Sequence, residues 1–381
     1  MKKISISVIL FAILLTSCSS NVPAPSTLPA NTATPTSTFI PQPTQTATPQ
    51  PTQTVLPTLA PFLDTNKFRL VTVNAITPID TISVDPLFAG QMDYWVVGDE
   101  GFIARWGIGS PTYVDSPAGR RNLYDVDFVA PDDGWVVGED EVILHWNGAE
   151  WEISKPPVDS EWPYSYNLYN VTFISRNDGW AGGCVGSEGG EYFLVYHWDG
   201  VAWSEVALSE ERDLWACVHD IVALSSDNVW MTGTGSDRGK EYGVTMHWNG
   251  TRWERFADLN SYNIHSMSAL SPDNIWALTR YGVVLNWNGI EWSEKVALDF
   301  PVLFYSPVIF ARGLDDVFVV GGKIFHWDGS TWMEISSNSN IPDDMYIVDI
   351  VEGGISEGGN PFIRMLDSSG IMYSFSKESF R

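Results

Sequence analysis

The sequence of 381 residues is short of basic side chains, and this shortage narrows the range of its partners. Only 21 Lys and Arg stand against 47 Asp and Glu, the formal net charge is −26, and no basic run occurs. Nucleic acid and anionic lipid headgroups attract proteins through clustered Lys and Arg. We therefore expect neither as a partner. We interpret the acidic charge as a means of keeping the protein soluble, with calcium binding or capture of a basic partner as the alternatives.

Motifs of several enzyme classes are also missing. The sequence has no zinc-ligand spacing, no Gly-x-Ser-x-Gly elbow and no nucleotide-binding glycine loop. The glycines between Gly186 and Gly190 are followed by no helical pattern and no lysine, so they indicate a loop. The sequence therefore predicts no cofactor, no metal and no catalytic residue.

Long hydrophobic runs are absent after the first residues of the chain. The run from Ile4 to Leu15 follows Lys2 and Lys3 and is too short to span a bilayer, which takes about 20 residues. With Cys18 soon after it, the segment resembles the signal of bacterial lipoproteins. The resemblance implies a signal peptide over residues 1–17, acylation of Cys18 and an extracytoplasmic protein anchored to the cell membrane. A chance cysteine after a signal peptide is the alternative.

Charge is absent from Ser19 to Leu63, where proline and threonine dominate. Such a stretch cannot bury a core, and proline holds it extended. We therefore predict that residues 18–64 are the lipidated cysteine and a disordered spacer through a cell-wall layer, ahead of a folded domain over residues 65–381. A disordered leader of no selected length is the alternative.

Cysteine is scarce: after Cys18, only Cys184 and Cys217 remain. An oxidising compartment would allow these two to form a disulfide, which would close a loop of about 30 residues and add roughly 3 kcal/mol of stability. Two free buried thiols are the alternative.

Tryptophan, in contrast, is abundant and periodic. The clearest motif is His145-Trp146-Asn147-Gly148-Ala149-Glu150-Trp151. Near copies occur at His197–Trp203, His247–Trp253, Asn286–Trp292 and His326–Trp332. A degenerate copy begins at Arg105-Trp106. About 30 to 40 residues separate one copy from the next, which is the period of a propeller blade.

Each repeat predicts four short β-strands and no helix. Around the clearest copy the strands span residues 123–129, 135–138, 142–146 and 151–154, and the Asn-Gly or Asp-Gly pair between the last two favours a two-residue hairpin. Second-strand markers occur at Trp95, Trp135, Trp180, Trp230, Trp276 and Phe318, with a last unit near residues 362–364. We therefore predict an all-β, seven-bladed β-propeller of four-stranded antiparallel blades.

The two ends of the domain suggest how the ring closes. The last unit supplies three strands, at residues 346–351, 362–366 and 371–375. Lys67–Val73 precedes the expected inner strand of the first blade, near residues 82–88. We predict that Lys67–Val73 is the outer strand of the last blade, because a closed ring leaves no terminal blade with an unsatisfied face.

Residues at repeated positions are expected to be structural. Flat sheets packed around an axis need large apolar side chains between them, so Trp135, Trp146, Trp151 and their counterparts are predicted to form the core. The histidines at one repeat position are predicted to form hydrogen bonds within each blade: His145, His197, His247 and His326. The Asp and Asn before each second-strand aromatic are predicted to accept backbone donors in a turn.

The unit Trp-x-Val-Gly-x-x-Gly, seen at Trp95–Gly101, is followed by an Asp/Asn-Gly-x-x-Trp turn. Together they resemble the bacterial neuraminidase (BNR, or Asp-box) repeats, and most of all the repeat propellers of exported bacterial proteins and photosystem assembly factors. The resemblance implies the propeller fold and leaves the activity open, because the box is a structural turn remote from the active face. This chain departs from the usual box, which has Ser or Thr where His326 stands.

The connections from second to third strand, and from one blade to the next, share one face in propellers, and here they vary most. We call this end of the blades the variable-loop face. Aromatic rings with nearby polar groups suit saccharide or peptide binding. The candidate ligand-binding residues there are Trp162, Tyr164, Tyr166, Glu188, Glu191, Glu210, Arg212, Trp215, Arg238, Phe304 and Tyr305. Neutral sequence variation in loops, without any ligand, would also explain these residues.

These observations predict a surface-displayed, lipid-anchored and monomeric binding or scaffolding module for a saccharide or protein ligand. A carbohydrate-active hydrolase, sialidase-like or another glycosidase, is the first alternative. Phe68-Arg69-Leu70-Val71 resembles the sialidase Phe-Arg-Ile-Pro segment, but sialidases also need three convergent arginines and a Tyr/Glu pair. The carboxylates to examine for glycosidase activity are Glu188, Glu191, Glu210, Glu211 and Asp213. An envelope assembly factor is the second alternative, and we favour binding over catalysis.

Overall fold

The computed structural model describes thirteen stretches of the chain. They are residues 70–78, 92–106, 112–158, 164–187, 190–208, 216–237, 240–256, 259, 261–299, 307–335, 347–355, 361–367 and 372–376. The chain divides into two units, Met1–Thr58 and Leu59–Arg381, and every described residue belongs to the second. The predicted signal peptide, Cys18 and the spacer lie outside the described residues. Within the described stretches, no helix has the length and apolar character needed to cross a membrane.

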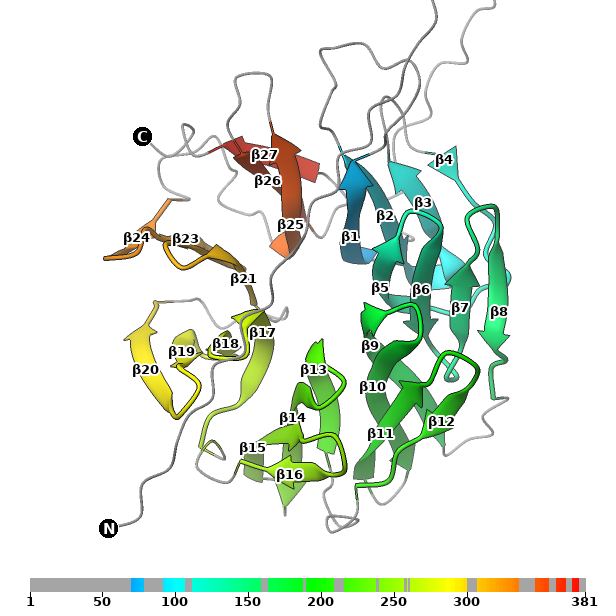
Figure 1. Ribbon diagram of the computed structural model, residues 1–381, viewed down its shortest axis with the longest axis horizontal. Helices are drawn as coiled ribbons and strands as arrows, with labels where there is room; N and C mark the ends of the chain where they lie inside the picture. The colour runs from blue at the N-terminus through cyan, green and yellow to red at the C-terminus, as the bar shows by residue number, and fades with distance from the viewer. Residues whose placement is uncertain are drawn as a thin grey trace, which may run out of the picture. The chain divides into compact units, whose positions relative to one another are not determined.

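Seven antiparallel sheets make up the second unit (Figure 1). Blade 1 has β1 (Leu70–Pro78), β2 (Met92–Gly98), β3 (Ile103–Trp106) and β4 (Thr112–Tyr113); blade 2 has β5 (Leu123–Ala130), β6 (Asp133–Gly138), β7 (Ile143–Trp146) and β8 (Trp151–Lys155); blade 3 has β9 (Ser165–Ser175), β10 (Asp178–Ser187), β11 (Gly190–Trp198) and β12 (Trp203–Glu205). Blade 4 has β13 (Ala216–Ser225), β14 (Asn228–Asp237), β15 (Lys240–Trp248) and β16 (Trp253–Arg255); blade 5 has β17 (Ile264–Ser271), β18 (Asn274–Thr279), β19 (Val283–Trp287) and β20 (Trp292–Ala297). Blade 6 has β21 (Val308–Gly313), β22 (Asp316–Val320), β23 (Ile324–Trp327) and β24 (Trp332–Glu334); blade 7 has β25 (Ile347–Ile355), β26 (Pro361–Asp367) and β27 (Met372–Ser376).

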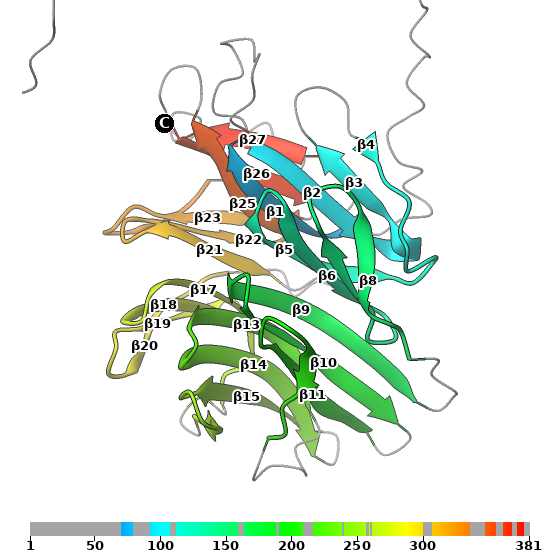
Figure 2. The same ribbon diagram turned by 45° about the vertical axis from the view of Figure 1, so that its right-hand side comes forward.

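The first strand of each blade is the inner strand, and the inner strands follow one another around a closed circuit. Strands β1, β5, β9, β13, β17, β21 and β25 each contact the next, and β25 contacts β1 (Figures 1 and 2). A 3-10 turn (η2, Asp99–Gly101) connects β2 to β3, and α-helix is absent from the described residues. The predicted all-β, seven-bladed propeller is confirmed.

The predicted closure of the ring is wrong. β1 pairs with β2 from Leu70 opposite Gly98 to Pro78 opposite Met92, so it is the inner strand of blade 1 and not the outer strand of blade 7. Its backbone groups pair with the strand that follows it in the sequence, as in every other blade, and among the described residues blade 7 has three strands. The ring closes by packing instead. β1 contacts β25, and the guanidinium of Arg364 on β26 lies 4.7 Å from the ring centroid of Tyr94 on β2.

Tryptophans join neighbouring blades, as the repeat predicts. Trp95 of blade 1 is 1% exposed and lies 4.8 Å from Trp146 and 5.3 Å from Trp151 of blade 2, measured between ring centroids. The same contact is made by Trp135, Trp180, Trp230 and Trp276 with the tryptophan pair of the blade that follows. Each such ring removes a large apolar area from water, so the core consists of wedges between blades.

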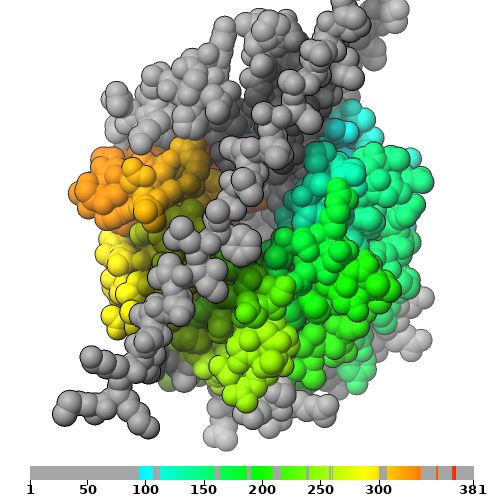
Figure 3. Space-filling model, viewed as in Figure 1, coloured from blue at the N-terminus to red at the C-terminus, as the bar shows by residue number. Residues whose placement is uncertain are grey.

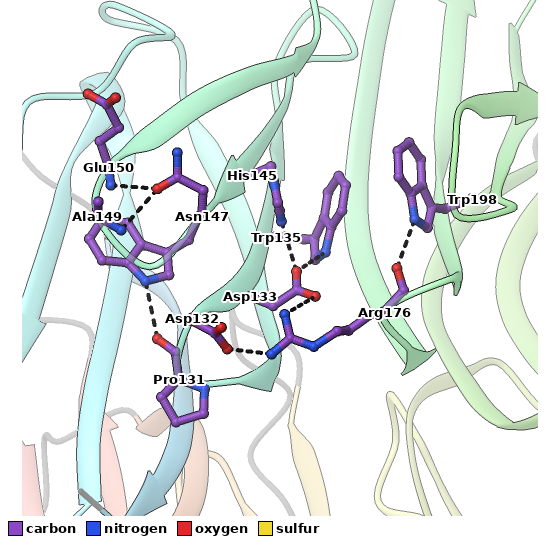
Figure 4. A network of polar contacts seen from close by, with 11 residues as sticks. Pro131, Asp132, Asp133, Trp135, His145, Asn147, Ala149, Glu150, Arg176 and Trp198 are labelled. Atoms are coloured by element: carbon purple, nitrogen blue, oxygen red, sulfur yellow. Dashed lines mark hydrogen bonds and ion pairs between the residues drawn. The ribbon is translucent and has the colours of Figure 1, made fainter.

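The repeated histidines are structural, as predicted. The Nε2 atom of His145 lies 2.8 Å from Asp133 Oδ1, which also accepts the indole N–H of Trp135 at 3.1 Å (Figure 4). The pairs His197–Asp178, His247–Asn228 and His326–Asp316 repeat the 2.8 Å contact. Each of these acidic or amide residues lies two positions before the second-strand aromatic, which itself pairs with the third-strand histidine. Their side chains therefore bind a ring from the third strand, where we had expected them to accept backbone donors in a turn.

The hairpin around the Asn-Gly pair begins and ends at the predicted residues. Trp146 pairs with Trp151, and the backbone N–H of Asn147 donates to Glu150 O at 3.2 Å, so Gly148 and Ala149 are the two residues inside the turn. Asn147 Oδ1 accepts the backbone N–H groups of Ala149 at 2.9 Å and Glu150 at 3.0 Å (Figure 4). Gly148 has φ of +91°, and a Cβ there would lie 2.9 Å from Asp132 Cβ. The turn therefore needs a side-chain acceptor followed by glycine.

Candidate functional site

Two neighbouring blades carry longer hairpins than the others at the variable-loop face. In blade 2 the pairing of second and third strands ends at Val137 opposite Ile143. In blade 3 it continues to Ser187 opposite Gly190, and in blade 4 to Asp237 opposite Lys240. Blades 3 and 4 therefore extend beyond their neighbours at the end where we expected a ligand.

A disulfide joins these two blades. Cys184 on β10 and Cys217 on β13 are bonded, with their Cα atoms 4.8 Å apart, which is the first of the two alternatives left open by the sequence. The strands approach closely because glycine faces the junction: a Cβ on Gly182 would lie 2.9 Å from Val218 Cγ1. Figure 3 shows the surfaces of the two blades, green and yellow-green, side by side, and β13 contacts both β10 and β11.

Four inner strands carry a ring-bearing side chain at one irregular position. Strand pairing skips one residue in the first half of each of β5, β9, β13 and β17, and another near its end. The residues at the first skip are Tyr124, Tyr169, His219 and His265, and we call them the bulge cluster. A bulge re-aims the side chain of the extra residue and often occurs next to functional sites. The rings of Tyr124 and Tyr169 lie 4.9 Å apart between centroids, and those of His219 and His265 lie 3.9 Å apart and nearly parallel.

The two histidines of the bulge cluster are held neutral. Burial lowers the pKa of His219 to about 4, and Arg280 adds to the effect by charge repulsion. Burial also lowers the pKa of His265 to about 3, with His219 and Arg280 contributing. His219 Nε2 lies 2.8 Å from Thr234 Oγ1, which donates to Asn263 Oδ1. Uncharged imidazoles beside a guanidinium can accept as well as donate hydrogen bonds.

The two tyrosines keep their protons. Burial raises the pKa of Tyr124 to about 12, and it also raises the pKa of Tyr169, with Glu191 and Glu139 adding to the second shift. The amide of Asn167 donates to the hydroxyl oxygen of Tyr169 over 3.1 Å. The bulge cluster thus presents neutral rings with polar edges, and carboxylates and Arg280 act on it electrostatically.

Arg280 lies beside the bulge cluster and is partly exposed. Its backbone N–H donates to Asn263 O, and its guanidinium is 4.0 Å from the carboxylate of Glu241 at the start of β15. Both side chains are about half exposed, so this pair holds the guanidinium weakly. Arg280 can therefore supply a positive charge to a ligand at this face.

Carboxylates on the inner strands bridge neighbouring blades below the bulge cluster. Asp125 accepts the backbone N–H of Val171 in the next blade at 2.8 Å, and Asp127 accepts that of Phe173 at 2.7 Å. Burial raises the pKa of Asp125 well above its usual range. These contacts fix the positions of successive inner strands, and with them the spacing of the rings in the bulge cluster.

A tyrosine–glutamate pair of the kind that sialidases use is present but buried. Tyr196 donates to Glu141 Oε2 at 2.9 Å, and Lys155 also contacts this carboxylate. Glu141 is 4% exposed, and its φ of +59° follows +57° at Asp140, so the backbone is held in an unfavourable conformation. The Lys155 ammonium and the packing of blades 2 and 3 leave this pair no access to a sugar.

Few of the candidate ligand-binding residues fall in the described part of the chain. Trp162, Glu188, Glu210, Arg212, Trp215, Arg238, Phe304 and Tyr305 lie outside it, as do Glu211 and Asp213. Tyr164 is exposed and its ring centroid lies 6.4 Å from that of Tyr166. Glu191 is exposed beside the disulfide. Tyr164 and Tyr166 are thus brought together. Glu191 is close enough to the bulge cluster for its charge to raise the pKa of Tyr169.

The bulge cluster was not predicted from the sequence. Its members occupy one repeat position, in the segments Leu-Tyr-Asp-Val, Leu-Tyr-Asn-Val, Val-His-Asp-Ile and Ile-His-Ser-Met. His219 and His265 are the two histidines outside the repeated tryptophan motif, which was the available signal. The alternation of polar and apolar residues along a strand does not show where a bulge occurs, so these four residues could not be identified from it.

Known proteins resemble this chain in fold and not in sequence. No family model and no curated protein matches it. The solved structure of YCF48 from Cyanidioschyzon merolae superposes with a TM-score of 0.54 at 16% identity, over 82% of this chain and 96% of that one. Virginiamycin B lyase from Staphylococcus aureus, in a catalytically inactive form with quinupristin, gives 0.55 at 12% identity, over 81% and 98%. YCF48 bound to D1 peptide gives 0.50 at 18% identity, over 82% and 98%.

The chain is a β-propeller. Identities this low establish the fold alone, so ligand and activity do not transfer from these neighbours. The predicted relation to Asp-box repeats stays a prediction.

Proposed function

We propose that this propeller is a binding module whose variable-loop face, over blades 2 to 5, receives a protein or peptide ligand. The observation that carries the proposal is the bulge cluster, in which four consecutive blades place a polar ring at the same inner-strand position. Rings with polar edges supply contact area at a low cost in conformational entropy and make adaptable hydrogen bonds. The long hairpins of blades 3 and 4 flank this surface and enlarge it.

A peptide fits these features better than a sugar. Arg280 offers a positive charge to a carboxylate of the peptide, and Glu241 and Glu191 offer negative charges to its basic side chains. The backbone amides of a peptide can also form hydrogen bonds with neutral imidazoles. One fold neighbour is a YCF48 structure with a bound peptide, which supports the idea that a propeller of this kind can hold one. Glycosidase activity gains no support from the described carboxylates, because the Tyr196–Glu141 pair is buried.

The test is selection of a random-peptide display library on the immobilised full-length protein, followed by calorimetry with the enriched peptides. We expect His219→Gln and Tyr169→Leu each to weaken binding by about tenfold or more, as for residues at the centre of an interface. Ile290→Ser is the matched control, because Ile290 is 84% exposed in the β19–β20 turn at the opposite end of blade 5. Peptides that bind the bulge-cluster variants as tightly as the wild type would contradict the proposal. Specific ligands from a glycan array, with none from the peptide library, would also contradict it.

We further propose that the protein is an extracytoplasmic lipoprotein acylated at Cys18. The support is the apolar run that precedes Leu15-Thr16-Ser17-Cys18 and the uncharged Pro/Thr-rich segment that follows it. Metabolic labelling with an alkyne-tagged fatty acid should mark the wild-type protein and not Cys18→Ser. Equal labelling of both would exclude this anchor.

A further inference from the structure

Three metal-ligand side chains meet where blades 3 and 4 join. The sulfur atoms of Cys184 and Cys217 and a carboxylate oxygen of Glu191 all lie within 4.8 Å of one another. We propose that, once the disulfide is reduced, these three residues bind one zinc ion. The site would be an alternative to the disulfide. It shares Glu191 with the proposed ligand-binding surface but needs no peptide ligand to form.

The strand register places the three groups together. On β10, Cys184 pairs with Phe193 of β11, and Glu191 lies two residues before Phe193. Side chains alternate along a strand, so Glu191 is on the same face as Phe193, diagonally across from Cys184. Gly186 stands directly opposite Glu191 and puts no side chain between them. Cys217 comes from β13 of the next blade, at the junction that the disulfide spans.

The donor set favours zinc over harder cations. Two thiolates and one carboxylate match the sulfur and oxygen ligands of Zn²⁺, whereas Ca²⁺ and Mg²⁺ prefer oxygen alone. Zinc sites with three protein ligands keep a fourth position for water or another group. Glu191 is exposed, so solvent has access to this side of the site. All three ligands stand on paired strands, which hold a site more firmly than loops do.

The conversion balances with an external two-electron reductant, either a dithiol or a phosphine. The S–S bond of Cys184 and Cys217 accepts two electrons and two protons; a dithiol becomes a disulfide, and a phosphine takes the oxygen of water and becomes a phosphine oxide. Zinc then displaces the two thiol protons to solvent as the two Zn–S bonds form. In the reverse step a small-molecule disulfide is the oxidant: it accepts two electrons from the two thiolates and two protons from solvent and becomes two thiols. The Cys184–Cys217 bond re-forms and the ion is released, so metal and disulfide exclude each other.

The proposal is tested with the full-length protein, reduced by tris(2-carboxyethyl)phosphine and titrated anaerobically with Co²⁺, a spectroscopic substitute for Zn²⁺. We expect one equivalent of Co²⁺ to give tetrahedral d–d bands and a thiolate charge-transfer band, and Zn²⁺ to abolish both. The oxidised protein and Cys217→Ser should give neither. Glu191→Gln should bind more than about tenfold more weakly, since losing a ligand costs at least as much as losing an outer-shell partner.

The matched control is Glu241→Gln. Glu241 occupies the equivalent hairpin position in blade 4, opposite Ser236, where no cysteine pair exists. Its substitution should leave Co²⁺ affinity unchanged. Circular dichroism must show that the reduced protein keeps its strands, because two thiols in an unfolded chain also bind metal. Absence of the charge-transfer band, or equal affinity of the wild type and Glu191→Gln, would overturn the proposal.

Discussion

The carboxylate of Asp220 in blade 4 accepts the backbone N–H of Met267 in blade 5 at 2.6 Å, and that of its own neighbour Ile221 at 2.7 Å. Asp220 thereby joins two inner strands whose sequence positions differ by 47. Burial raises its pKa to about 6, in spite of both hydrogen bonds. The Asp220 carboxyl therefore both joins two blades and titrates near neutral pH.

Asp220 should make stability depend on pH. A carboxyl whose pKa rises from 3.8 to about 6 on folding contributes stability that is fully present below pH 3.8 and lost as the pH rises through 6. The free energy of unfolding of the wild type, minus that of Asp220→Asn, should therefore decrease between pH 4 and pH 7. Urea unfolding at intermediate pH values measures it. A constant difference would show that Asp220 does not titrate in this range.

His265 should have the opposite effect. Its pKa falls from 6.5 to about 3, so its contribution to stability is present above pH 6.5 and is lost as the pH falls towards 3. Relative to His265→Gln, the wild type should lose stability between pH 7.5 and pH 5. Thermal unfolding of both proteins across this range is the measurement, with Ile290→Ser as a substitution that leaves the pH profile alone. Parallel profiles for the wild type and His265→Gln would contradict the assignment.

Trp180 should be essential to the packing of blades 3 and 4. It is 1% exposed and lies 5.1 Å from Trp248 and 5.4 Å from Trp253, between ring centroids. We expect Trp180→Ala to lower the free energy of unfolding by about 3 to 5 kcal/mol, and Trp180→Phe to lower it by less. Denaturant unfolding gives both values. A loss below about 1 kcal/mol for the alanine variant would mean that the wedge between these blades carries little of the stability.

Reduction of the disulfide should destabilise the fold without unfolding it. The bond between Cys184 and Cys217 closes a loop with a sequence separation of 33, which corresponds to roughly 3 kcal/mol. In the presence of a chelator, reductant should lower the melting temperature of the wild type. The double variant Cys184→Ser/Cys217→Ser should melt at the same temperature with and without reductant. A wild type insensitive to reductant would show that the unfolded chain gains little freedom when the bond is broken.

Several features of the fold were predictable because they depend on local patterns. The blades could be counted from Trp95, Trp135 and their counterparts, since each second strand places one large ring at the same depth. The structural role of His145 followed from its recurrence. The last blade also has the three strands expected of it, β25 to β27.

Other features depend on which segment pairs with which. The N-terminal strand β1 had the right composition for either edge of the ring, and only its register with β2 placed it inside blade 1. The Asn-Gly pair after Trp146 suited a turn centred on those two residues, whereas the backbone bond from Asn147 to Glu150 puts Gly148 and Ala149 inside it.

For the candidate site, the sequence pointed to the face that we propose binds a ligand and to one residue beside the bulge cluster, Glu191. It could not indicate that the ring of Tyr124 contacts that of Tyr169, or that His219 stacks on His265. A strand with perfect alternation and a strand with one extra residue have nearly the same composition, yet the bulge turns that residue toward a different neighbour.

The sequence by itself determined the class of the fold, the blade repeat and the tryptophan core, because strand alternation and ring size act within a few residues. The tertiary structure decided how the ring closes, which rings stack and which cysteine sulfurs meet. Those outcomes depend on contacts between blades, such as the one from Asp125 to Val171 over 46 residues, and a single-residue shift in register changes all of them.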